Sequence, residues 1–372
     1  MVRTATLPWQ PWTAPEPFRS RVKLARTLPL EHVGLHLQAL TAGFRSCPLH
    51  DHLFEEEQFY VLSGVLTVTE RTPEGVRREF ELRAGELVVY PPGTGLAHGF
   101  SNRGAQDVFF LAFSDRHPGD VCTYPDSDKT NFRSYAIGAW RVHGGTGIES
   151  TTEALDPAAW RARARARREQ EKLEQLSLGG RPAHVVPLEV AEAERGRGRK
   201  RLASALLSRA GGAQQVFLNR DRLPPGCVSS ELHRHRFNEE AVLLVEGHLT
   251  LRQRDEAGDE TLTTLQPGDL VYWRPSDPYH QLRNHTERDA LYLTLGTDVG
   301  WDVLELPERD LLYSAALDQM GRLEVLDYFD GEAESPGAAE SATTAPPSRA
   351  DRDPRDSDGS PARPQPAGSA RE

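Results

Sequence analysis

The stretch HDHLFEEEQFYVLSG, residues 50–64, decides the fold, because it returns as HRHRFNEEAVLLVEG at residues 233–247. In both copies one residue separates two histidines, a glutamate follows after four more residues, and a glycine follows that glutamate after six. Corresponding residues such as His50 and His233 stand 183 positions apart, and a later histidine repeats as His98 and His280 at 182 positions. Such self-similarity predicts two copies of one fold.

The residues that repeat are of the types that bind transition metals. On a strand, residues i and i+2 share a face, so the two histidines of each HxH triplet point into the same space. Three imidazoles and one carboxylate leave two positions open on a six-coordinate ion, where substrate, water or dioxygen can bind. The predicted ligands are His50, His52, Glu57 and His98 in the first copy, and His233, His235, Glu240 and His280 in the second. The alternative is a buried network of histidines and glutamate that holds no metal.

Length and composition set the class of protein. The chain has 372 residues, enough for two domains, and a net charge of -11, which argues against general affinity for nucleic acid. It has three cysteines, no long apolar run, and no apolar stretch near its N-terminus. These features predict a cytoplasmic protein without a disulfide framework or a membrane segment.

The pattern along the chain predicts an all-β fold with one helix. Short apolar runs such as QFYVLSGVLTV and AVLLVEGHLTL, bounded by turn residues, are typical of strands. A helix is expected after Asp156-Pro157, before Gly179-Gly180. The last 42 residues lack aromatic residues, Leu, Ile and Val, so they are expected to be disordered. The expected parts are an N-terminal arm (1–25), a first domain (26–148), a helical linker (149–180), a second domain (181–330) and the tail (331–372).

Both repeats resemble the two signature motifs of the cupins, a superfamily of small jelly-roll barrels. HDHLFEEEQFYVLSG and HRHRFNEEAVLLVEG match the first motif, and GELVVYPPGTGLAHGFSN and GDLVYWRPSDPYHQLRN resemble the second more loosely, with Asp277 where glycine is usual. The resemblance implies a bicupin, two jelly-roll β-barrels joined by the linker. It also implies one divalent transition metal in each domain, Fe(II) or Mn(II) before Zn(II) or Ni(II).

Side chains next to the predicted ligands are expected to line a pocket. Residues two positions from a ligand on the same strand share its face. The expected lining residues are Phe59, Phe100, Val242 and Leu282 by this rule, with Tyr90 and Tyr272 as possible proton donors and Arg274 as a partner for a carboxylate. Simple barrel core is an equally good interpretation of the apolar ones. The other histidines, His184 among them, are interpreted as ordinary surface or strand residues, and Cys47 and Cys227 as buried apolar residues.

The resemblance implies a function only as a class. Bicupins of this kind suggest a metal-dependent enzyme that acts on a small organic acid or aromatic compound, by dioxygenation or decarboxylation. The alternative is a non-catalytic sensor or storage protein that binds a small molecule. Nucleic-acid binding through the arginine runs at 161–168 and 195–201 is a weaker hypothesis. The sequence names no catalytic acid or base, and a homodimer through edge strands or the N-terminal arm is compatible with it.

Overall fold

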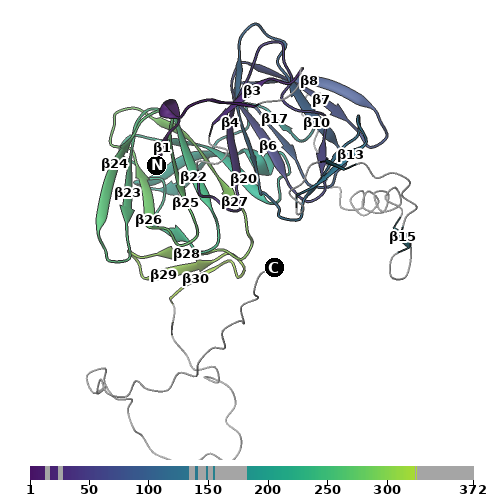
Figure 1. The fold of residues 1–372 in the computed structure, drawn as a ribbon. Helices are drawn as coiled ribbons and strands as arrows, with labels where there is room; N and C mark the ends of the chain where they lie inside the picture. Colours follow the sequence, from purple (N-terminus) through teal and green to yellow (C-terminus); the bar gives the residue numbers. More distant parts are fainter. Residues whose placement is uncertain are drawn as a thin grey trace, which may run out of the picture. The chain divides into compact units, whose positions relative to one another are not determined.

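A computed structural model gives the fold of this chain and describes residues 1–12, 17–23, 28–133, 139–140, 148–149, 154–155, 182–322 and 324. Nearly all of the regular structure in these residues is strand, as Figure 1 shows. The strands form two sets with the same topology, each a seven-stranded sheet with a three-stranded and a four-stranded sheet. The predicted all-β fold of two jelly-roll barrels is confirmed.

The first barrel contains the first ligand set. Its large sheet has the order β17-β9-β6-β11-β4-β3-β2, and its smaller sheets have the orders β10-β7-β8 and β14-β13-β12-β5. The bounds are β2 (Gln10–Trp12), β3 (Ser20–Lys23), β4 (Gly34–Leu40), β5 (Asp51–His52), β6 (Glu57–Ser63), β7 (Val65–Arg71), β8 (Arg77–Arg83), β9 (Leu87–Tyr90), β10 (Ala97–Ser101), β11 (Val108–Ser114), β12 (Val121–Tyr124), β13 (Lys129–Phe132), β14 (Ala139–Trp140) and β17 (Val185–Val186).

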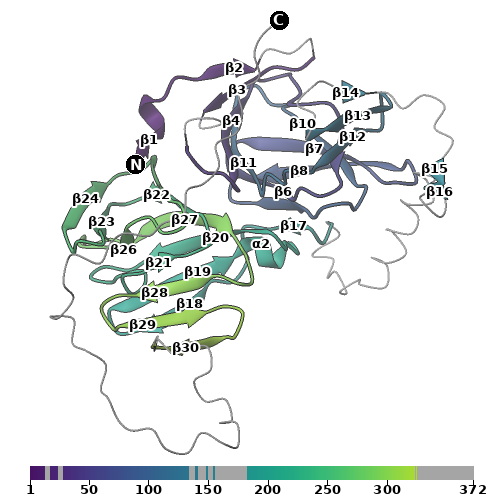
Figure 2. The ribbon, with the colours of Figure 1, turned by 60° about the horizontal axis from the view of Figure 1, so that its bottom comes forward.

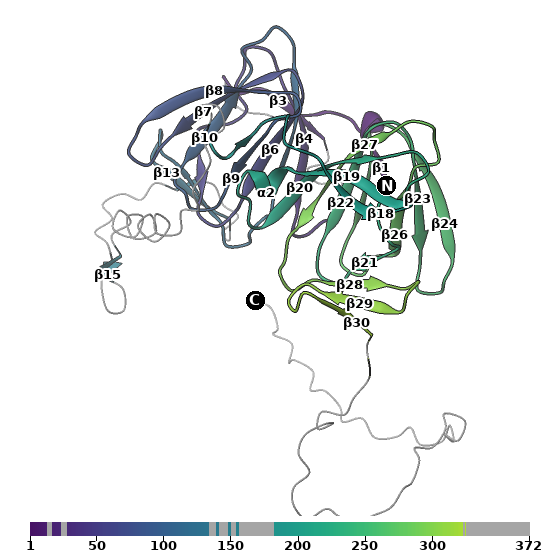
Figure 3. The ribbon, with the colours of Figure 1, turned by 180° about the vertical axis from the view of Figure 1, so that it is seen from behind.

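The second barrel repeats this arrangement strand by strand. Its large sheet has the order β1-β25-β22-β27-β20-β19-β18, and its smaller sheets are β24-β23-β26 and β21-β28-β29-β30. Figure 2 shows β28, β29 and β30 next to one another, and Figure 3 shows β22 near β20 from behind. The bounds are β1 (Val2–Arg3), β18 (Ala193–Arg197), β19 (Lys200–Leu206), β20 (Val216–Leu223), β21 (Arg234–His235), β22 (Glu240–Glu246), β23 (Leu249–Arg254), β24 (Glu260–Leu265), β25 (Asp269–Trp273), β26 (Tyr279–Arg283), β27 (Ala290–Thr297), β28 (Val303–Leu306), β29 (Leu311–Ser314) and β30 (Gln319–Gly321).

The two barrels exchange one short strand each. β1, at the start of the chain, pairs with β25 of the second barrel, and β17, which follows the linker, pairs with β9 of the first. Part of the expected N-terminal arm therefore belongs to the second barrel's sheet, and its later part, β2 and β3, extends the first barrel's sheet. Val185–Val186, expected in the second domain, is hydrogen-bonded into the first. The domain limits given above stay predictions.

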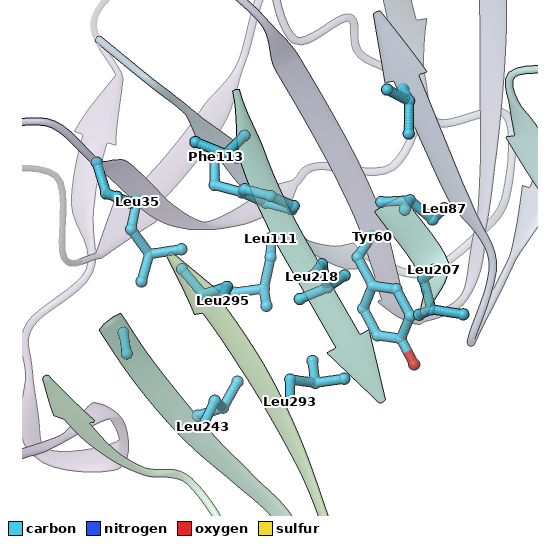
Figure 4. Close-up of a cluster of buried hydrophobic side chains, with 14 of the residues drawn as sticks. Leu35, Tyr60, Leu87, Leu111, Phe113, Leu207, Leu218, Leu243, Leu293 and Leu295 are labelled. Carbon is cyan, nitrogen blue, oxygen red and sulfur yellow. The ribbon is translucent and has the colours of Figure 1, made fainter. Parts of the chain in front are cut away.

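Three hydrophobic cores hold the described structure together. One fills each barrel, around Phe110 in the first and Leu244 in the second. The third joins the barrels, because leucines on the outer faces of both large sheets pack together, including Leu111, Leu218 and Leu293 (Figure 4). Successive side chains along a strand point to opposite faces of the sheet. One face of each large sheet therefore lines its own barrel, and the other face packs against the other barrel.

Two buried glutamates fasten the barrels to each other at the rim of this shared core. Glu239 accepts hydrogen bonds from the backbone N–H groups of Glu31, His32 and Val33, at 2.6, 2.9 and 2.8 Å. Its counterpart in the repeat, Glu56, accepts from the N–H groups of residues 214 and 216, at 2.6 and 3.4 Å. Because residues 31–33 and 214–216 are themselves 183 positions apart, the two contacts are reciprocal.

The remaining described elements are short. They are the 3-10 helix η1 (Thr4–Thr6), the helix α2 (Leu207–Ala210), and the paired strands β15 (Ile148–Glu149) and β16 (Ala154–Leu155). The linker helix predicted after Asp156, the arginine run at 161–168 and the predicted tail lie outside the described residues. The run at 195–201 covers the end of β18, the turn and the start of β19. Among the described residues, no helix is both long and apolar enough to cross a membrane.

Candidate metal centres and the cavity of the second barrel

The four predicted ligands of the first barrel come together at one end of its interior. His50 directly precedes the two-residue strand β5, and His52 is its second residue. His50 also forms an antiparallel bridge with His98 on β10. Glu57 opens β6 beside them. The Nε2 atoms of His50, His52 and His98 lie 3.4, 3.3 and 3.0 Å from one carboxylate oxygen, Oε2 of Glu57.

The opposite ring nitrogens show how these histidines are oriented. Nδ1 of His50 lies 2.9 Å from the carbonyl oxygen of Pro48, and Nδ1 of His52 lies 2.6 Å from a carboxylate oxygen of Asp120. Because these oxygens can only accept, Nδ1 carries the proton and Nε2 presents its lone pair. Lone pairs and a carboxylate oxygen then converge on one point, and Nε2 of His52 is buried without a hydrogen-bond partner. This donor set fits a bound cation.

The negative charge of Glu57 also favours a bound cation in the first centre. Burial opposes ionisation of Glu57, but the charge of neighbouring His52 and hydrogen bonds from His50 and His98 hold its pKa well below the usual range. Burial would lower the pKa of His52, yet Glu57 and the hydrogen bond to Asp120 raise it well above its ordinary value. The carboxylate thus attracts a proton onto His52, and a divalent metal would replace that proton.

The second barrel contains the same constellation. The Nε2 atoms of His233, His235 and His280 lie 4.0, 3.4 and 2.9 Å from Oε2 of Glu240. Burial and the charge of His280 lower the pKa of His233 to about 3, so its imidazole stays neutral, as a metal ligand must be. Burial opposes the charge on His235, but Asp302 and Glu240 raise its pKa to about 10.

Two aspartates that the sequence reasoning missed support these histidines. Asp120 and Asp302 each accept a hydrogen bond from Nδ1 of the second histidine of the HxH triplet, at 2.6 Å in both barrels. Each also accepts from two backbone N–H groups of the loop that follows this triplet. Their separation of 182 positions, the same as that of His98 and His280, is the signal that could have found them.

An aromatic ring covers the last histidine of each set. Tyr90 is stacked on His98 with ring centres 3.7 Å apart, and Trp273 is stacked on His280 at 3.8 Å. The hydroxyl of Tyr90 donates to buried Glu70 at 2.9 Å, and Nε2 of His184 lies 2.7 Å from the same carboxylate oxygen. The interpretation of His184 as an ordinary surface or strand residue is wrong, because β17 carries its neighbours into the first barrel and buries it there.

The two centres differ in the space beside them. The space at the first ligand set is about 10 Å³, whereas a cavity of about 170 Å³ adjoins His233, Glu240 and His280 in the second. The repeat gives the reason: Phe59 and Phe100 help to fill the first barrel, and the smaller Val242 and Leu282 stand at the corresponding positions in the second. The cavity's other lining residues include Arg195, Ser204, Asn219, Asp221, Ser229, Ser230 and Thr294.

Some of the predicted lining residues border the space beside the ligands, and others belong to the hydrophobic core. Val242 and Leu282 line the cavity of the second barrel, and Tyr90 borders the small space in the first. Phe59 and Phe100 are core, within the aromatic cluster of the first barrel. Two other expected lining residues, Tyr272 and Arg274, lie outside the cavity of the second barrel.

Tyr272 follows the inward-facing Val271 on β25, so it points out of the barrel, where it packs against the core between the barrels. Arg274 follows the end of that strand, and its half-exposed side chain forms an ion pair with Asp277. Neither residue lines the cavity.

Comparisons with known proteins agree with this architecture. The family model of the cupin domain matches residues 36–114 and 219–296. No curated protein matches the chain. Solved structures similar to it include an oxalate decarboxylase studied for a switch in reaction specificity (16% identity, TM-score 0.48, covering 81% of this chain and 78% of that one). They also include a formate complex of the Lactobacillus farciminis oxalate decarboxylase (17% identity, TM-score 0.47, covering 80% of this chain and 85% of that one). A third is the Bacillus subtilis oxalate decarboxylase at pH 4.6 (16% identity, TM-score 0.46, covering 80% of this chain and 75% of that one).

At these TM-scores the likenesses say nothing about the reaction of this chain. The family rests on the two domain matches, which fall on the two barrels, each with its own set of three histidines and a glutamate. The chain is therefore a bicupin, a member of the cupin superfamily with two cupin domains.

Proposed function

We propose that this bicupin is a metal-dependent enzyme whose reaction takes place in the second barrel, on a small organic acid or a compound of similar size. The observation that carries the proposal is the cavity of about 170 Å³ beside His233, Glu240 and His280. A catalytic metal site needs an open position next to the ion, and the second barrel has room for a ligand there. The space at the first ligand set, about 10 Å³, is too small for one.

The size and lining of the cavity favour a small polar substrate. An apolar cavity of about 150 Å³ admits a molecule such as benzene, so this one suits a compound with roughly six to ten non-hydrogen atoms. Part of the lining is polar, with Ser204, Asn219 and Thr294 as hydrogen-bonding groups. Arg195, also part of the lining, supplies positive charge for a carboxylate.

Asp221 is the best candidate for proton transfer in this cavity. Its carboxyl is buried and accepts a hydrogen bond from Oγ1 of Thr294 at 2.7 Å. Burial raises its pKa, against the hydrogen bonds from Ser204 and Thr294, which lower it. A carboxyl that keeps its proton to higher pH can deliver it to a carbon that has lost carbon dioxide, and becomes a carboxylate in doing so. Tyr292, whose pKa burial raises well above the usual range, stays a hydrogen-bond donor beside it.

The metal would be held by the three Nε2 atoms and the carboxylate of the second set. When bound, it supplies Lewis acidity for decarboxylation or a redox centre for dioxygenation. Fe(II) or Mn(II) suits this set of nitrogen and oxygen donors with open positions, and Zn(II) or Ni(II) are alternatives. The protein's own part is to orient the substrate carboxylate towards the metal, hold the proton on Asp221, and exclude water with Val242, Leu282 and Trp273.

The test is a substrate screen with matched variants. Protein purified without oxygen is loaded with Mn(II) or Fe(II) and offered small hydroxy, keto and dicarboxylic acids and single-ring aromatic acids, while carbon dioxide release and oxygen consumption are followed. We expect turnover in the wild type, its loss in Glu240→Gln, and its retention in Glu57→Gln, the same change in the other barrel.

Two outcomes would contradict the proposal. Loss of turnover in Glu57→Gln with retention in Glu240→Gln would place the reaction in the first barrel. Saturable binding of a screened acid to the metal-loaded protein, with no turnover under either atmosphere, would favour the alternative function, a non-catalytic protein that binds a small molecule. Cytoplasmic location and dimer formation stay predictions.

A further inference from the structure

We propose that Cys122 is a fifth ligand of the metal in the first barrel, so that the two centres differ in chemistry as well as in space. Cys122 lies on β12 directly opposite His52 on β5. Its Sγ atom and one ring nitrogen each of His50 and His52 all lie within 4.8 Å of one another. The inference requires that the first ligand set binds a metal, and it does not depend on any turnover.

The surroundings of Cys122 favour coordination over packing alone. Cys122 is 7% exposed, and the Nε2 atom of His52, the residue opposite it, is buried without a hydrogen-bond partner. A metal that both atoms bind would satisfy that nitrogen and turn the thiol into a thiolate, the form that binds metals. Sulfur therefore lies beside His50 and His52, two of the four predicted ligands of the first set.

The second barrel provides an internal comparison. The residue opposite His235, at the position that corresponds to Cys122, is Leu304. Sulfur is thus available to only one of the two otherwise matching ligand sets in the described residues. Soft thiolate ligands favour Zn(II), Cu(I) or iron over Mn(II), whereas nitrogen and oxygen ligands alone leave Mn(II) acceptable. We therefore expect the first centre to select a softer metal than the second.

Cys47 is close to the same histidine but is placed differently. Its Sγ lies 3.8 Å from Nδ1 of His50, the nitrogen that already faces the carbonyl oxygen of Pro48. It therefore contacts the side of the ring that faces away from Glu57. Cys47 is a matched control for Cys122, since both are cysteines next to His50 and only one lies on the ligand side.

A closed centre follows from the fifth ligand. With five protein ligands and about 10 Å³ beside them, the first centre leaves little access for a substrate. Closed sites with sulfur ligands are typical of structural metals, and open sites of catalytic ones. The duplication would then have separated two roles: the first barrel keeps a metal that stabilises the fold, and the second keeps a metal that meets the substrate.

Cobalt(II) is the probe, because thiolate ligation gives it an intense charge-transfer band in the near ultraviolet. Metal-free full-length protein is loaded with cobalt(II) without oxygen, and the absorption spectrum and bound metal are measured. We expect the band in the wild type and in Cys47→Ser and Cys227→Ser, and its loss in Cys122→Leu, which copies the second barrel. X-ray absorption of the zinc-loaded protein should show sulfur in the wild type and only nitrogen and oxygen in Cys122→Leu.

The reverse substitution keeps the test decisive if Cys122→Leu folds poorly. Leu304→Cys should add a second thiolate centre and roughly double the band. The proposal is overturned if Cys122→Leu keeps the wild-type band, if the band disappears in Cys47→Ser instead, or if the cobalt-loaded wild type shows no sulfur ligation. None of these outcomes bears on turnover in the second barrel, which Glu240→Gln tests separately.

Discussion

The two reciprocal glutamates at the junction of the barrels, Glu56 and Glu239, allow the change in the free energy of unfolding to be predicted for their replacement. Glu239 is 1% exposed and accepts three backbone hydrogen bonds from residues 31–33. Replacing it by alanine removes the acceptor for all three N–H groups. Those of Glu31 and His32 belong to exposed residues and can bind water instead, but Val33 is buried and its N–H group cannot.

The expected cost follows from these contacts. A buried N–H group left without a partner costs about 1–3 kcal/mol, and the loss of two charge-assisted hydrogen bonds to groups that regain water adds roughly 1 kcal/mol. We expect Glu239→Ala to lower the free energy of unfolding by about 2–4 kcal/mol, or the melting midpoint by roughly 4–8 °C. Glu56→Ala should behave alike, and Glu239→Gln, which keeps one acceptor oxygen, should cost about half as much.

The assay is thermal and urea denaturation followed by far-ultraviolet circular dichroism at one protein concentration. Glu246→Ala is the control, because it makes the same change at an exposed position at the end of β22, the strand that begins directly after Glu239. It should shift the free energy of unfolding by less than about 0.5 kcal/mol. If Glu239→Ala were as stable as this control, the hydrogen bonds to residues 31–33 would not hold the barrels together, and the reasoning would be refuted.

Three further predictions concern the interiors of the barrels. Val242→Phe places in the second barrel the ring that Phe59 has in the first. It should fill the cavity and abolish binding of a screened acid, while the metal content measured by mass spectrometry stays the same. Unaltered binding of the acid would contradict the role of the cavity. Asp221→Asn should raise the melting midpoint of metal-free protein at neutral pH, because the pKa of Asp221 is higher in the folded than in the unfolded chain and its ionisation therefore destabilises the fold. The gain should vanish below about pH 4, where the carboxyl is protonated in both states. A loss of stability at pH 7 would count against this account. Glu70→Gln should lower the melting midpoint, because the hydrogen bonds with His184 and Arg78 outweigh burial and lower the pKa of Glu70 in the folded chain. The stabilisation by ionised Glu70 is present above about pH 4.5 and is lost as the pH falls through the lowered folded pKa. A difference between variant and wild type that does not change with pH would refute this prediction.

Much of the architecture could be predicted from the sequence because it depends on local spacing. The period of two along a strand puts both histidines of an HxH triplet on one face, whatever the rest of the chain does. The duplication then predicts a second barrel wherever the first exists, and the structure brings His50, Glu57 and His98 together as it does His233, Glu240 and His280. Asp120 and Asp302 could have been found in the same way, since they obey the same repeat.

Other features depend on which strands meet, and the sequence does not contain that information in readable form. His184 is part of the first barrel only because β17 crosses over to pair with β9. Tyr272 faces the neighbouring barrel, although it is one residue from the inward-facing Val271, because the pleat alternates and only the fold says which face is inside.

The sequence by itself therefore determined the two jelly-roll barrels and the eight candidate ligands, because spacing along strands and the repeat are local properties. The tertiary structure alone decided that the open cavity lies in the second barrel, that Asp221 and Thr294 face it, and that Cys122 lies beside His52 in the first. The physical reason is that free space and neighbours across a sheet depend on the volumes and positions of side chains far apart in the chain, such as Phe59 with Phe100 and Val242 with Leu282. Both are set only when the strands pack.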